Sequence, residues 1–146
     1  VLLQDYDIEI SNTRRTLERV PEGKNDFKCH EKSMPLGKLA MHCASLPLFG
    51  YYIMEDEGMD LAAPKRPHVP LVFTTREAAL KQLDEAAAQC RASLVAASDE
   101  HLQKLWKFSY GEQAIGNNSR ALTFRRPSRS CFRPCSTNCP MACCRT

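Results

Sequence analysis

Apolar residues recur at helical spacing over three stretches of the chain. The first stretch runs from Leu3 to Val20, where apolar side chains return every three or four positions with Thr13 as the one polar member. This period predicts an amphipathic helix. Pro21 and Gly23 follow and should end it, because proline cannot continue a helix and glycine accepts turn conformations.

The second stretch begins after Ser33, a plausible N-cap, with Pro35 in the first turn. It runs to Met54, and Pro47 should kink the helix or end and restart it. Acidic residues 55–57 and Gly58 then close the segment as a solvated loop. Residues 61–72 contain three prolines and predict an extended connection in which His68 is an exposed loop residue.

His42 is the single histidine of this second helix. At helical spacing Leu39, Leu46, Phe49 and Ile53 surround it, so the pattern predicts that its imidazole faces the packed side. A buried imidazole needs a partner. A carboxylate, a backbone carbonyl or a divalent metal ion with two further protein ligands would each serve, and the spacing leaves these alternatives open.

The third stretch gives the clearest helix. Residues 74–77 have the spacing of a capping box, and a seven-residue apolar repeat continues to Ala97. Residues 98–101 break the pattern, and His101 is expected in solvent. Residues 102–110 form a short aromatic segment that is expected to cover one end of the core. Residues 111–118 are rich in turn-forming residues and predict a loop. Ser119 could cap a fourth helix that Pro127 stops.

These elements predict an all-α protein, an up-and-down four-helix bundle whose last helix is truncated. The bundle domain covers residues 1–125, and an irregular tail covers 126–146. Seven residues should share one core, and they are Ile10, Leu17, Leu39, Leu46, Leu83, Cys90 and Leu94.

Composition divides the chain close to this boundary, at about residue 120. All 17 acidic residues lie before position 120, whereas residues 120–146 hold six arginines and no lysine. Five of the eight cysteines lie in this tail. The scattered thiols of the body are typical of a cytoplasmic protein, and no membrane span or signal peptide is expected. Phosphate loops, serine elbows and nucleic-acid motifs are lacking, so a nucleic-acid partner is not expected.

Three segments resemble the opening of DinB-like (YfiT-like) proteins: residues 12–21 (NTRRTLERVP), 30–34 (HEKSM) and 39–47 (LAMHCASLP). The resemblance spans roughly residues 2–125. It implies a four-helix bundle with a three-histidine site for a divalent metal, typically zinc or nickel, in which His42 matches the first ligand. It also implies a metal-dependent hydrolase or thiol S-transferase activity on a small molecule or low-molecular-weight thiol, and it leaves a homodimer open.

The resemblance also implies two further histidines, four residues apart on the last helix. This chain has no histidine after His101, and the corresponding stretch contains Arg125, Pro127, Cys131, Pro134 and Cys135. Cys131 and Cys135 have ligand spacing, but the two prolines oppose the helix that would aim them. We therefore expect an incomplete metal site.

Two explanations of the tail remain open. A shifted reading frame or a missing true C-terminus would explain the abrupt change in composition. Alternatively, Cys131, Cys135, Cys139 and Cys143 form a zinc-binding or redox knuckle on a non-catalytic helical bundle, although their even spacing matches zinc pairs only weakly.

Overall fold

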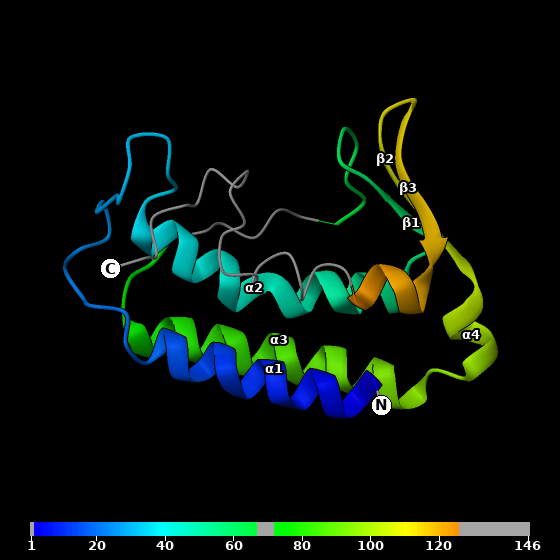
Figure 1. The fold of residues 1–146 in the computed structure, drawn as a ribbon, viewed down its shortest axis with the longest axis horizontal. Helices are drawn as coiled ribbons and strands as arrows, with labels where there is room; N and C mark the ends of the chain where they lie inside the picture. Colours follow the sequence, from blue (N-terminus) through cyan, green and yellow to red (C-terminus); the bar gives the residue numbers. More distant parts are fainter. Residues whose placement is uncertain (1, 67–71, 126–146) are drawn as a thin grey trace.

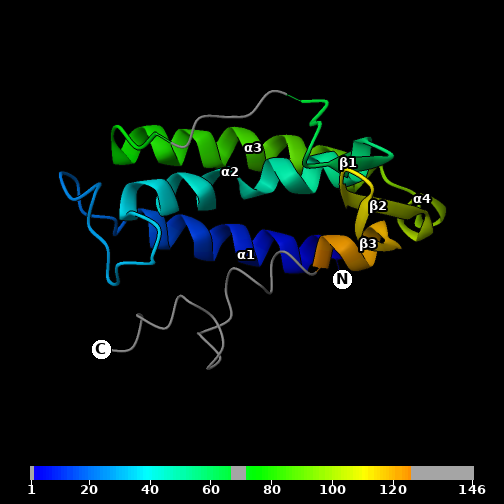
Figure 2. The same ribbon diagram turned by 90° about the horizontal axis from the view of Figure 1, so that it is seen from above.

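Three long helices form the body of the computed structural model, which describes residues 2–66 and 72–125 (Figure 1). They are α1 (Leu2–Leu17), α2 (Leu36–Glu55) and α3 (Arg76–Ala96), and they lie side by side in both views (Figure 2). A short helix and a three-stranded sheet occupy one end of this body: α4 (Asp99–Gln103), β1 (Gly58–Asp60), β2 (Leu105–Tyr110) and β3 (Gln113–Ser119). Residues 120–125 then begin another helix.

The prediction of an all-α four-helix bundle is wrong, because the chain folds as a mixed helix and sheet protein. In the sheet, β2 lies between β1, which is parallel to it, and β3, which is antiparallel. A parallel neighbour requires a long connection, and α3 and α4 supply it between β1 and β2. At Gly58 a Cβ atom would lie 2.6 Å from the Lys107 carbonyl oxygen, so glycine permits this close pairing.

The expected aromatic cover is confirmed, because Trp106 is fully buried in the core cluster at this end of the body. The hairpin of β2 and β3 replaces the expected turn-rich loop. Only Gly111 and Glu112 form the turn, with Gly111 at φ +57°, which suits the glycine that begins a type II′ hairpin. The polar residues of β3 predict a loop, whereas the structure has a strand there. Gln113 and Asn117 are exposed, and the strand is held by backbone pairing with β2 rather than by burial of its side chains.

The helices do not alternate in direction as an up-and-down bundle would. The end of α1 meets the beginnings of α2 and α3, where Leu17, Met41 and Leu83 share one buried cluster. The beginning of α1 meets the ends of α2 and α3, where Tyr6 and Cys90 join Ile53 in a second cluster. Thus α2 and α3 run parallel to each other and opposite to α1.

The predicted core is only partly correct. Leu17, Leu83, Cys90 and Leu94 are buried, but they divide between the two clusters, and Ile10 packs on both from a half-buried position. Leu39 and Leu46 are half-buried. Burial raises the pKa of the Cys90 thiol to about 11, so this side chain stays protonated at neutral pH and packs as a small apolar group.

α2 packs on the bundle through several small residues as well as through Met41, Ile53 and Met54. Gly37, Ala40, Ala44 and Gly50 are buried, and the helix continues through a buried Pro47. His42 lies two positions from Ala40 and Ala44, which is about 200° around a helix. His42 is therefore half-buried on the outer side of α2, and the prediction that it faces the packed interior is wrong.

The helix starts agree more closely with their sequence signals. The Thr75 hydroxyl caps α3 by accepting from the Ala78 amide, one residue later than the predicted box. Ser119 accepts from the Leu122 amide, as its predicted role as a cap requires. Pro35, not Ser33, precedes α2 without a side-chain cap.

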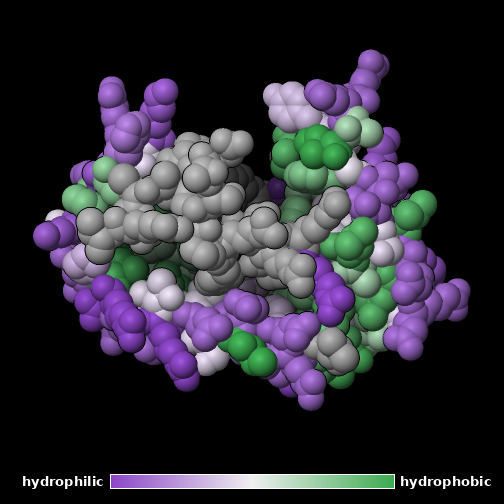
Figure 3. Space-filling model, in the orientation of Figure 1, coloured by the Kyte–Doolittle hydropathy of each residue, from purple (hydrophilic) through white to green (hydrophobic). Residues whose placement is uncertain are grey.

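Exposed apolar side chains lie mainly near the sheet on the face in Figure 3, whereas hydrophilic residues dominate the edge formed by α1 and α3. Leu61, Leu105, Tyr110 and Ile115 are among the exposed large hydrophobic residues. In the described part of the chain, no helix combines the length and apolar character needed to cross a membrane.

Candidate functional site

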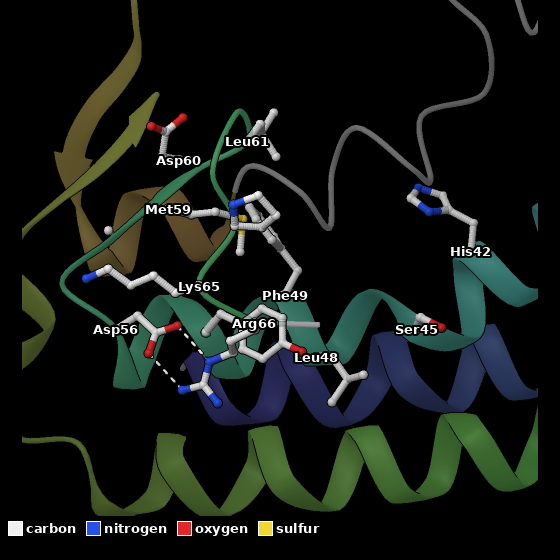
Figure 4. A pocket seen from close by; sticks show the side chains of 13 residues that line it. His42, Ser45, Leu48, Phe49, Asp56, Met59, Asp60, Leu61, Lys65 and Arg66 are labelled. Atoms are coloured by element: carbon white, nitrogen blue, oxygen red, sulfur yellow. Dashed lines mark hydrogen bonds and ion pairs between the residues drawn. The ribbon is translucent and has the colours of Figure 1, made fainter. Parts of the chain in front are cut away.

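A cavity of about 310 Å³ lies between the outer side of α2 and the segment that follows it (Figure 4). From α2 it is lined by His42, Ser45, Leu48, Phe49 and Tyr52. From the following segment it is lined mainly by Asp56, Met59, Asp60, Pro64, Lys65 and Arg66. The wall combines apolar and aromatic groups with a few charged ones, which is the usual composition of a small-molecule site.

An ion pair between Asp56 and Arg66 joins the two ends of the segment that follows α2. Arg66 donates from Nε to Asp56 Oδ2 at 2.9 Å and from Nη2 to Oδ1 at 2.7 Å. The guanidinium carbon lies 4.8 Å from the Tyr52 ring centroid and 5.3 Å from that of Tyr51. Two hydrogen bonds and two ring faces therefore fix the plane of this side chain.

Asp60 anchors the middle of the segment. Its Oδ1 accepts from the Ala62 amide at 2.9 Å and from the Gly111 amide at 2.8 Å, the second of which belongs to the hairpin turn. The amide of Leu61 also donates to the Ser109 carbonyl. The cavity wall is thus fastened to α2 by Asp56 and to the sheet by Asp60.

Both carboxylates are stabilised in their charged form. The hydrogen bonds from Arg66 lower the pKa of Asp56, and the Gly111 and Ala62 amides lower the pKa of Asp60. Asp56 in turn raises the pKa of Arg66. Because these folded-state values are depressed, the stabilisation is present above the ordinary aspartate pKa and is lost as pH falls through the folded value.

Two side chains bind the carbonyl groups at the C-terminal end of α2, next to the cavity. Arg120 is buried, and its Nη1 donates to the carbonyl oxygens of Ile53, Met54 and Asp56, the last two at 3.2 and 2.7 Å. His101 Nε2 lies 2.8 Å from the Met54 carbonyl oxygen. These side chains satisfy carbonyl groups that a helix end leaves without partners.

Two expectations about this region are therefore wrong. His101 is partly buried against α2 rather than solvated. Asp56 is not a solvated loop acid at the negative end of α2, because it pairs with Arg66 and lies near the positive charge of Arg120. The unfavourable placement of an acid at a helix C-terminus is offset by these two cations.

His42 is the predicted metal ligand, and it lines the cavity at the end opposite the Asp56–Arg66 pair (Figure 4). Within residues 2–66 and 72–125, no three His, Cys, Asp or Glu side chains come together to hold a metal ion. His42 has no second and third ligating side chain beside it among the described residues, so its surroundings there do not fit a three-histidine centre. His68, Cys131 and Cys135 lie outside the described residues, as does the whole predicted tail.

The pairing of Asp56 with Arg66 could not be predicted from residue spacing. The two residues are ten positions apart, which matches no helix or strand period, and Arg66 sits among prolines. A cluster of three acids after an aromatic pair, followed by a Lys-Arg pair, is the only visible hint. The hydrogen bond between Asp60 and the Gly111 amide likewise requires the hairpin, which the polar sequence of β3 does not predict.

Comparison with models of known protein families found no match, and comparisons with curated proteins and with solved structures also found none.

Proposed function

We propose that this chain binds a small molecule in the cavity over α2, that it presents His42 to this ligand, and that it is related to the DinB-like proteins without sharing their four-helix bundle. The observation that carries the proposal is the place of His42, which lines the cavity instead of the bundle core. An imidazole in a cavity wall is available to a ligand or a metal ion, whereas a core histidine is taken up by protein partners.

The DinB-like resemblance supports a divalent metal, zinc or nickel, at His42. The described residues supply no second and third ligand, so a metal ion there would keep most of its water and exchange readily. For this reason we derive no hydrolase or thiol-transfer step through a metal. A zinc or redox role for the cysteine-rich tail stays an alternative prediction, and no described residue favours it.

Zinc titration of the full chain tests the proposal. Long-range ¹H–¹⁵N spectra report each imidazole separately, with His42→Ala used to assign the His42 signals. We expect the His42 signals to shift gradually and reversibly with Zn²⁺, because one accessible imidazole binds weakly.

His101 is the matched control on the same protein, since its Nε2 already lies 2.8 Å from the Met54 carbonyl oxygen. Its signals should move far less than those of His42. Equal responses of the two histidines, or no response of His42, would contradict the proposed exposure of His42 to the cavity.

A further inference from the structure

The guanidinium of Arg66 has N–H donors that no described residue accepts from. Of the five N–H donors of an arginine, Asp56 accepts from two, one on Nε and one on Nη2. The other three have no acceptor among the described residues. They include both donors on Nη1, so the edge of the guanidinium formed by Nη1 and Nη2 remains available.

This edge is held ready for a second oxyanion. Arg66 lines the cavity, its side chain is 36% exposed, and the rings of Tyr51 and Tyr52 restrain its plane. A guanidinium fork matches a carboxylate or phosphate with two parallel hydrogen bonds, and a restrained fork loses less freedom on binding. Lys65 lines the same cavity and makes no ion pair with the described residues, so it adds positive charge.

Apolar groups complete the recognition. Leu48, Phe49 and Met59 line the cavity with Arg66, and the Phe49 ring is fixed by edge contacts with Trp106 and Phe108 at centroid distances of 5.8 and 5.9 Å. Leu48 and Phe49 lie along α2 between Tyr52 and His42. About 15 Å of helix separates His42 from Tyr52 at 1.5 Å per residue. A ligand anchored at Arg66 would therefore extend toward His42 over an apolar floor.

We propose that the Arg66 end of the cavity is an oxyanion subsite, and that the ligand is a small molecule with a carboxylate or phosphate group attached to an apolar chain. This inference rests on the proposed function, since it assigns a ligand class to the same cavity. It assigns Arg66 a binding role beyond its structural pairing with Asp56.

The test uses three probes that share a six-carbon chain: hexanoate, hexyl phosphate and 1-hexanol. Binding to the full chain is followed through the Nε–Hε signals of the arginines. Hexanoate or hexyl phosphate should bind more tightly than hexanol and should shift the Arg66 signal. Tighter binding of hexanoate would identify the preferred group as a carboxylate, and tighter binding of hexyl phosphate would identify it as a phosphate.

Arg91 is a matched control because it pairs with Asp7 through the same Nε and Nη2 geometry, at 2.9 and 3.1 Å, outside the cavity. Arg66→Gln should weaken the preferred anion by roughly tenfold to a hundredfold, the cost of losing charged hydrogen bonds. It should weaken hexanol binding by a smaller factor, because hexanol carries no charge for Arg66 to bind. Arg91→Gln should behave like the parent chain.

A second variant, Asp56→Asn, is expected to raise the affinity for the anion. It therefore tests the inference even if Arg66→Gln does not fold. Asp56→Asn keeps an acceptor for Arg66 but removes the competing negative charge, so the anion should bind several times more tightly. Anions that bind no better than hexanol, or an Asp56→Asn variant with unchanged or weaker anion affinity, would overturn the inference. The zinc response of His42 is independent of Arg66, so failure here is distinguishable from failure of the proposed function.

Discussion

Replacing Trp106 with alanine is expected to lower the free energy of unfolding by about 3–5 kcal/mol, the usual cost of removing a large buried aromatic side chain. Trp106 is fully buried on β2 and stacks on Phe108 at a centroid distance of 5.8 Å. It also meets the edge of the Phe49 ring on α2. Urea unfolding of the parent chain and the variant measures the loss.

Tyr110 provides the control because it lies on the same strand but is 60% exposed. Tyr110→Ala should change the free energy of unfolding by no more than about 0.5 kcal/mol. A Trp106→Ala loss below about 1 kcal/mol would mean that the sheet does not close the core of the helical body. The sheet would then be an appendage to a helical domain.

Arg120→Met is expected to lower the free energy of unfolding by about 2–4 kcal/mol, because the Ile53 and Asp56 carbonyl groups lose their side-chain donor and Met54 keeps only His101. The guanidinium Nη1 serves three carbonyls at the end of α2, and methionine offers similar bulk but no N–H group. Loss of the hydrogen bond to the Asp56 carbonyl should also make Asp56, and with it the cavity wall, less well ordered. Thermal or urea unfolding gives the magnitude.

An exposed arginine separates this effect from simple loss of charge. Arg14 pairs with Asp84 at 2.6 Å, but both side chains are more than 40% exposed. Arg14→Met should cost only about 0–1 kcal/mol, as solvent-exposed ion pairs do. Equal losses for the two variants would argue against a special role for Arg120 at the helix end.

The long helices could be predicted because their apolar residues follow the helical period. The face of α2 could not, since this helix is apolar on several sides and hydropathy alone does not distinguish them. The side that meets the bundle combines small residues such as Ala40 and Ala44 with Met41 and Ile53. The hydropathy pattern therefore predicts an interior position for His42 that the structure does not show.

The sheet was missed for a different reason. β1 has three residues, and β3 carries Gln113, Asn117 and Asn118, so neither shows an alternating apolar pattern. Their pairing with β2 is made by backbone groups that every sequence possesses. Of the candidate site, His42 could be identified from the chain alone, whereas Asp56 and Arg66 come together only through the tertiary fold.

Metal content after purification and dialysis shows whether His42 faces the cavity without completing a metal site there. The full chain is compared with His42→Ala. We predict that the two retain the same amount of zinc and nickel, because a single imidazole cannot hold an ion through dialysis. One equivalent of metal per chain that disappears in His42→Ala would contradict this account.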